Sequence, residues 1–204
     1  MTPAGFLSSL PFVLRWENGY VDNPDDPGGA TNRGITQRVY NDWRSHHGLG
    51  VRDVRLIDDE ELRAIYQTCY WVPPQCDLLS GPLDLVQFDT AVNMGVGRAI
   101  RMLQASLGCL VDGDFGPGTQ HAADTCDIGT TVKKYCERRE SYYRTLAQNN
   151  PRLAIFLKGW INRLNALRRD VGLPDHEAAV PLDLGDTDHI AKIPDPGVHQ
   201  TYDF

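Results

Sequence analysis

Several features that mark common classes of protein are missing from this sequence. It has no Cys-x-x-Cys pair, and no histidine lies within a few residues of any of its five cysteines, so the usual zinc-binding patterns are excluded. It has no glycine-rich phosphate loop, and no serine or cysteine stands in a nucleophile-elbow context. We therefore expect neither a metal nor an organic cofactor, and no zinc peptidase or amidase chemistry.

Positive charge is also scarce. The 20 Lys and Arg residues are outnumbered by 27 Asp and Glu residues, which gives a net charge of −7, and no basic block is present. Because nucleic acids and anionic membranes are bound largely through such blocks, we expect neither as a partner. A polyanionic substrate would be held locally, by hydrogen bonds and shape. No apolar run approaches the length of a bilayer span, so no membrane insertion is expected.

The cysteines and the first residues bear on where the protein acts. The cysteines are Cys69, Cys76, Cys109, Cys126 and Cys136. Their simplest interpretation is that of small buried apolar residues, although one or two disulfides would form in an oxidising compartment and leave one thiol over. No Lys or Arg precedes Arg15, and no small-residue cleavage site is present, so we expect no secretory signal peptide.

Most of the chain shows helical periodicity. Residues 83–97, "LDLVQFDTAVNMGVG", are apolar on most sides, which predicts a buried central helix. Asp58 stands three residues before Glu61, the spacing of a capping box that opens a helix.

The domain organisation is predicted from breaks in this periodicity. Two glycines flank Val96, which predicts a division between a lobe at residues 1–97 and a second helical lobe at residues 98–173. Residues 174–204 have scattered Pro, Asp and Gly and no periodicity, so they are expected to form an extended or disordered tail.

Residues 16–36, "WENGYVDNPDDPGGATNRGIT", depart from the helical pattern because turn residues alternate with short extended pieces. The stretch predicts a small hairpin after a helix that ends near Glu17. A carboxyl there has apolar neighbours such as Trp16 and lies at the negative end of the helix dipole. Both effects favour its protonated form, as a general acid requires. An ordinary exposed glutamate in a last helical turn fits the spacing equally well.

Further carboxylates follow in the same stretch. Turns set by Pro and Gly would bring Asp25 and Asp26 near the helix end that carries Glu17. Glycoside hydrolysis needs two carboxyl groups, one as the acid and one as a base or ion-stabiliser. Thr31 could hold a water molecule or a sugar hydroxyl. The alternative is a solvated loop in which Asp merely favours turns, whereas the residue order of a calcium loop is absent.

The stretch "ENGYVDNPDDPGGATNRGIT" resembles the opening motif of glycoside hydrolase family 108, the muramidases related to secretion activators and phage endolysins. That motif reads Glu-Gly-Gly-Tyr, a short polar stretch, Asp-Pro-Gly-Gly-x-Thr and then Gly-Ile-Thr. The resemblance implies that Glu17 is the catalytic acid, that Asp26 is the motif aspartate and that Thr31 is the motif threonine. One position departs from it, because Asn18 stands where the motif has glycine. Asn tolerates left-handed backbone better than other non-glycine residues, so the turn is expected to survive.

The resemblance extends over residues 8–173. "FDTAVNMGVGRAIRMLQ" looks like the second block of the family, a buried helix with Asn-x-Gly at its end. "VDGDFGPGTQHA", residues 111–122, resembles a turn of the small helical peptidoglycan-binding module that follows the catalytic lobe. Its glycines allow a turn and Thr119 could cap the next helix, so we favour a structural role for this motif over a dedicated glycan site.

Two polar residues of the central helix, Asp89 and Asn93, share one face among apolar neighbours and need partners. They either line a sugar cleft or tie the two lobes together. Because Asn93 begins the Asn-x-Gly block, we predict that it binds substrate, together with Tyr20 and Asp25.

These observations predict a mainly α, lysozyme-like, two-lobed helical fold with a small β-hairpin at the active-site cleft. The expected activity is cleavage of the β-1,4 bond between N-acetylmuramic acid and N-acetylglucosamine. Glu17 would protonate the leaving oxygen, Asp26 would stabilise positive charge or orient water, and Thr31 would help to place that water. The alternatives are a lytic transglycosylase and a non-catalytic peptidoglycan-binding or assembly protein.

The same interpretation sets the expected partners and location. The substrate would be the glycan strands of peptidoglycan, met in the periplasm or cell wall by a monomer made in the cytoplasm. Delivery would then depend on a phage holin or a secretion apparatus. An immunity protein is a further partner that the sequence leaves open.

Overall fold

The computed structural model describes residues 3–17, 19–22 and 29–174. It is mainly helical, with one short hairpin near the start, so the predicted fold class is confirmed. Its α-helices and strands are α1 (Ala4–Leu14), β1 (Thr31–Asn32), β2 (Ile35–Thr36), α2 (Gln37–His46), α3 (Asp59–Tyr66), α4 (Leu83–Met94), α5 (Val96–Leu107), α6 (Pro117–Thr125), α7 (Ile128–Asn149), α8 (Pro151–Ala154) and α9 (Leu157–Asp170). The described residues also form the 3₁₀ or π turns η1 (Val54–Leu56), η2 (Gln67–Trp71) and η3 (Cys76–Leu78). No described helix is long and apolar enough to cross a bilayer.

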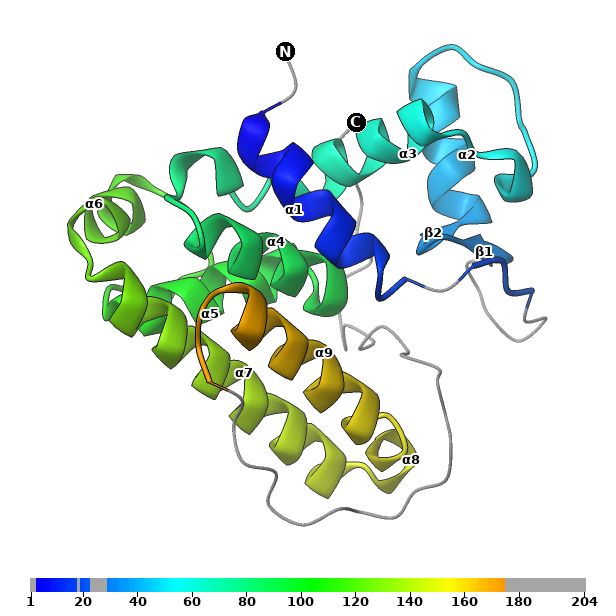
Figure 1. The fold of residues 1–204 in the computed structure, drawn as a ribbon. Coiled ribbons are helices and arrows are strands. Elements are labelled where there is room, and N and C mark those ends of the chain that lie inside the picture. Colours follow the sequence, from blue (N-terminus) through cyan, green and yellow to red (C-terminus); the bar gives the residue numbers. More distant parts are fainter. Residues whose placement is uncertain (1–2, 18, 23–28, 175–204) are drawn as a thin grey trace.

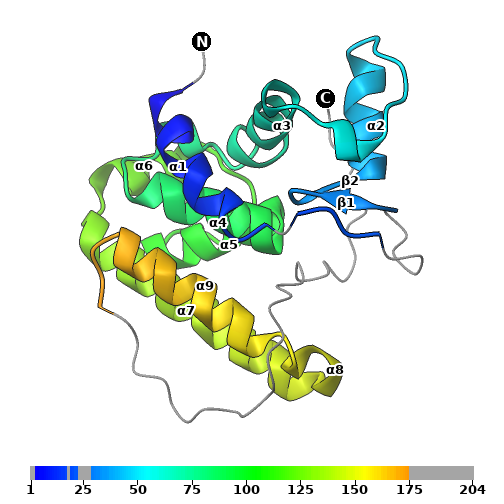
Figure 2. The ribbon, with the colours of Figure 1, turned by 45° about the vertical axis from the view of Figure 1, so that its right-hand side comes forward.

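Helix α4 is the centre of the molecule. Every residue from Val86 to Met94 is buried, as the apolar sequence of this helix predicts. Helix α1 packs on one side of α4, while α5 and α7 pack on others. Figures 1 and 2 show α9 lying alongside α7, with α8 at the far end of this pair.

A smaller lobe contains α2, α3 and the hairpin, at the right of Figure 1. Helix α3 begins with the predicted capping box, in which the Asp58 side chain accepts hydrogen bonds from the N–H groups of Glu60 and Glu61. The hairpin pairs Thr31 with Thr36 and Asn32 with Ile35. Its two turn residues, Arg33 and Gly34, both have positive φ, which is the twist that two-residue hairpin turns require.

The two lobes predicted from the sequence, residues 1–97 and 98–173, share one apolar core. A single cluster of buried side chains includes Phe6 from α1, Phe88 from α4, Tyr135 from α7 and Trp160 from α9. The glycine-flanked position predicted as a lobe boundary lies where α4 passes into α5 at Gly95, whose φ is +90°. Because burial continues across this position, the lobes stabilise each other. The predicted domain limits themselves stay predictions.

Candidate active site

Glu17 lies just beyond α1, which ends at Leu14. The Glu17 N–H donates to the Leu14 carbonyl oxygen at 3.3 Å, so the residue continues the chain in a turn after the helix. Its side chain is only 7% exposed, and its Oε1 lies 3.1 Å from Nη1 of Arg163. The environment expected from the sequence was apolar, but the observed partner of this carboxyl group is a guanidinium.

The other oxygen of Glu17 faces the hairpin turn. Gly34 has a φ of +80°, and a Cβ atom built on it would stand 2.5 Å from Oε2 of Glu17 and would also collide with the hydroxyl of Tyr66. That hydroxyl donates to the Arg33 carbonyl oxygen at 2.9 Å. Burial, followed by the negative charge of Glu17, raises the pKa of Tyr66 well above its usual value, so the phenol stays a neutral donor. The glycine of Gly-Ile-Thr therefore leaves the space that the carboxylate occupies.

Behind Glu17 lies a cluster of buried charges. Arg163 of α9 contacts Asp89 of α4, with Nε and Nη2 both 2.8 Å from Oδ1. Arg139 of α7 reaches the other oxygen of Asp89, with Nη1 2.6 Å from Oδ2. Burial alone would raise the pKa of Asp89, but the charges of Arg163 and Arg139 outweigh this effect and hold the pKa below its usual value. Asp89 is therefore a carboxylate that ties α4 to α7 and α9, which is one of the two roles considered for it.

Asn93 belongs to the same polar network. Its Oδ1 accepts a hydrogen bond of 2.7 Å from the Tyr143 hydroxyl, and that hydroxyl accepts from Nε of Arg139 at 2.6 Å. Nη1 of Arg139 also donates to the Thr90 hydroxyl at 3.2 Å. Asn93 is 2% exposed, and its role in binding substrate stays a prediction.

Two other predicted site residues, Thr31 and Tyr20, lie on or next to the hairpin. Thr31 opens β1, and its backbone exchanges hydrogen bonds of 2.7 and 2.8 Å with Val21. Tyr20 is 42% exposed, donates to Asp22 at 3.3 Å and has the Arg55 guanidinium 5.4 Å from its ring centre. The predictions for Asp25 and Asp26 fall outside the described residues.

The motif at residues 111–122 forms a turn organised by Gln104. Its Nε2 donates to Oδ1 of Asp112 at 2.7 Å and to the Thr119 hydroxyl at 3.1 Å, while its Oε1 accepts from the Gly113 N–H at 2.9 Å. This agrees with the structural role that we favoured. Thr119, however, does not cap α6: the cap position is Gly116, and Thr119 lies inside the helix, where its hydroxyl faces Gln104.

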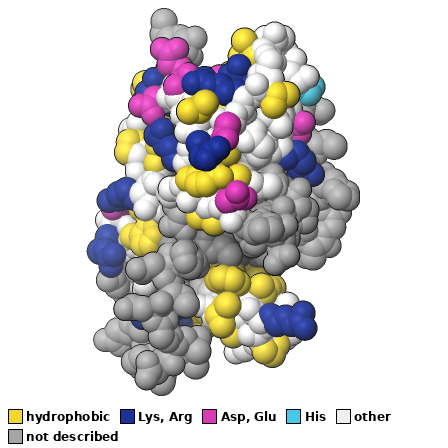
Figure 3. Space-filling view, turned by 90° about the vertical axis from the view of Figure 1, so that its right-hand side faces the viewer, with side chains coloured by type: hydrophobic (Ala, Val, Ile, Leu, Met, Phe, Trp, Pro, Cys, Tyr) yellow, Lys and Arg dark blue, Asp and Glu magenta, His cyan; other side chains and the backbone are white. Residues whose placement is uncertain are grey.

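The surface of the lobe with the hairpin mixes charges of both signs. Figure 3 shows Lys and Arg interspersed with Asp and Glu over the upper part of that face, among the side chains of the described residues. Such a surface offers local contacts to a ligand and no broad field.

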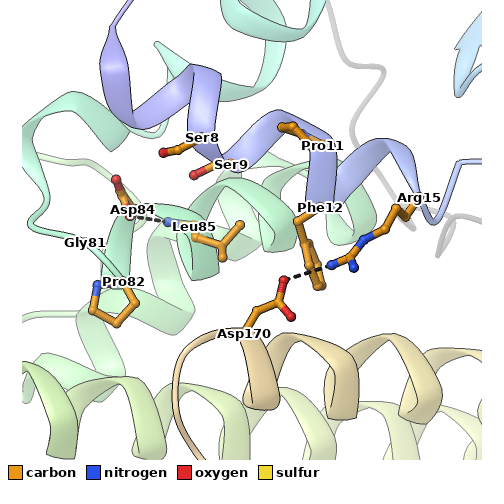
Figure 4. Close-up of a pocket in the computed structure, with 10 residues that line it drawn as sticks. All are labelled: Ser8, Ser9, Pro11, Phe12, Arg15, Gly81, Pro82, Asp84, Leu85 and Asp170. Atoms are coloured by element: carbon orange, nitrogen blue, oxygen red, sulfur yellow. Dashed lines mark hydrogen bonds and ion pairs between the residues drawn. The ribbon is translucent and has the colours of Figure 1, made fainter.

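A cavity of about 500 Å³ runs along α1. Arg15 at the end of α1 and Asp170 at the end of α9 meet across its edge at 2.8 Å, in an exposed ion pair (Figure 4). Its lining residues are Ser8, Ser9, Pro11, Phe12, Arg15, Gly81, Pro82, Asp84, Leu85 and Asp170. Glu17 is not among these lining residues.

Comparison with known proteins places two matches on the chain. The model of a family described as "Glycosyl hydrolase 108" matches residues 10–95, and that of a family described as "Predicted Peptidoglycan domain" matches residues 98–165. Among solved structures, SagA from Brucella abortus superposes with a TM-score of 0.68 at 30% sequence identity, over 86% of this chain and 98% of that one. No significant match was found among curated proteins.

Proposed function

This chain belongs to the glycosyl hydrolase 108 family, and on that premise we propose that it is a muramidase with Glu17 as its general acid. Family membership makes it a glycoside hydrolase, and the match of residues 98–165 to a peptidoglycan domain supports peptidoglycan as the substrate. The bond cleaved would be the β-1,4 bond between N-acetylmuramic acid and N-acetylglucosamine.

The observation that carries this proposal is the space kept for one carboxyl group. Glu17 and Gly34 are distant in the motif but meet in the fold, where a side chain at position 34 would occupy the place of Oε2. Arg163 fixes Oε1 from the other side. A carboxyl group held on both sides and close to the surface is suited to deliver a proton to a glycosidic oxygen.

In the proposed reaction, Glu17 gives its proton to the leaving oxygen and becomes a carboxylate. Asp26 stabilises the positive charge that develops on the sugar or orients the attacking water. Thr31, on the same hairpin as Gly34, helps to place that water.

The test is digestion of purified peptidoglycan by the wild type and by Glu17→Gln, with the products identified by mass spectrometry. We expect reducing muramic acid ends from the wild type and none from the variant. Glu60→Gln is the matched control, because it makes the same chemical change at an exposed residue of α3 and should leave cleavage unaltered. Anhydro-muramic ends would reassign the protein to the lytic transglycosylases, and no cleavage by a folded wild type would leave a peptidoglycan-binding protein.

A further inference from the structure

We infer that Arg163 is a positioning residue for Glu17, so that the C-terminal helices complete the active site of the N-terminal lobe. The inference rests on the proposed role of Glu17 as the acid. Arg163 lies on α9, inside the segment matched by the peptidoglycan domain and 146 residues from Glu17 in the chain. It is 1% exposed, yet its Nη1 reaches the carboxyl group of Glu17.

The orientation of Arg163 is fixed from the side away from Glu17. Two of its nitrogens, Nε and Nη2, lie 2.8 Å from one oxygen of Asp89, so the plane of the guanidinium is set by α4. The third nitrogen, Nη1, is thereby directed at Oε1 of Glu17. Asp89 is held in turn by Arg139, so the whole arrangement is anchored to α7 as well.

The net charge of the cluster indicates why Glu17 belongs to it. Two guanidiniums, Arg163 and Arg139, pair with one carboxylate, that of Asp89. The ionised form of Glu17 is the second carboxylate, and it makes the group of four neutral. Buried charges are costly unless they are paired, and Arg163 supplies the partner for the state that Glu17 reaches once it has given up its proton. That state is the one formed as the leaving oxygen is protonated, and stabilisation of charge that develops in the transition state increases the rate.

The test compares Arg163→Lys with Arg139→Lys. Both arginines are buried and both pair with Asp89, but only Arg163 contacts Glu17. Lysine keeps the charge and loses the planar fork that spans two carboxyl groups. We expect both variants to lower the melting temperature by similar amounts. Only Arg163→Lys should lower kcat on soluble glycan strands, by about tenfold to a hundredfold with KM within about twofold, as a misplaced catalytic group does.

A second pair of variants keeps the test decisive if a lysine variant fails to fold. Asp89→Asn with Arg139→Met, and Asp89→Asn with Arg163→Met, each remove one carboxylate and one guanidinium. The first keeps the contact between Arg163 and Glu17, and the second abolishes it. Because both variants lose Asp89, which sets the plane of Arg163, we expect both to lose kcat per folded molecule, and the second to lose more because it also lacks the contact with Glu17.

The outcomes separate this inference from the proposed function. Equal kcat for the Arg163 and Arg139 variants, with cleavage by the wild type and none by Glu17→Gln, would overturn the positioning role alone. An inactive wild type would overturn both.

Discussion

Replacement of Gly34 by alanine tests whether the hairpin turn sets the position of Glu17. At a φ of +80°, any non-glycine residue costs about 1–2 kcal/mol of stability. The added Cβ would stand 2.5 Å from Oε2 of Glu17, whereas ordinary contact begins at 3.4 Å, so the carboxyl group must retreat by about 0.9 Å. A displacement of this size at a reacting group lowers kcat by about a hundredfold.

The matched control is Gly108→Ala, at the end of α5. Gly108 has a φ of +76° and no atom within 4 Å of a Cβ built there, so it has the same backbone cost and no contact with the site. The assay is release of dye from labelled peptidoglycan, divided by the folded fraction measured in urea. Both variants should lose about 1–2 kcal/mol from the left-handed backbone, and Gly34→Ala somewhat more because of the overlap. Full activity of Gly34→Ala would refute the reasoning, since Glu17 would then not need the space.

Two further predictions concern stability and thiol chemistry. The pKa of Asp89 in the folded protein is lowered from 3.8. Its contribution to the free energy of unfolding is therefore present above pH 3.8 and is lost as the pH falls through the folded pKa. Asp89→Asn should therefore unfold about 3–5 kcal/mol more easily than the wild type at neutral pH, because it leaves two buried guanidiniums without their carboxylate. This gap should close in strong acid, and urea titrations that show a constant gap down to pH 2 would contradict it. All five cysteines are free thiols, and burial raises the pKa of Cys136 to about 11, so a thiol reagent should modify the partly exposed Cys109 and Cys126 and reach the buried three only on unfolding. Equal rates for all five in the folded protein would contradict that burial.

The parts of the fold that depend on local sequence could be predicted. The central helix α4, the capping box at Asp58 and the hairpin after Glu17 all follow from patterns within about twenty residues. Glu17 itself was identified because the motif around it is long and ordered. These features are set by periodicity, by caps and by turn residues, which a single sequence displays.

The surroundings of Glu17 could not be predicted in the same way. Arg163 is 146 residues distant, and no spacing rule connects the two. A partial signal was present, since Arg139 falls on the same helical face as Val132 and Tyr135, and Arg163 adjoins Trp160 and Leu164 on the apolar face of α9. A charged residue on an apolar face requires a buried partner of opposite charge, but the sequence does not say which carboxylate it is. The sequence therefore pointed to Glu17, and it did not point to Arg163.

The distance along the chain between Glu17 and Arg163 has a consequence for synthesis in the cell. A ribosome adds about 5–20 residues each second, so about 7–30 s pass between the addition of Glu17 and the addition of Arg163. During that interval the nascent chain carries Glu17 without the cluster that orients it. If Glu17 is the acid and Arg163 positions it, a polypeptide released early would have the complete motif but not the contact that orients Glu17, and a cell producing this hydrolase would be exposed to its activity only once α9 has been made.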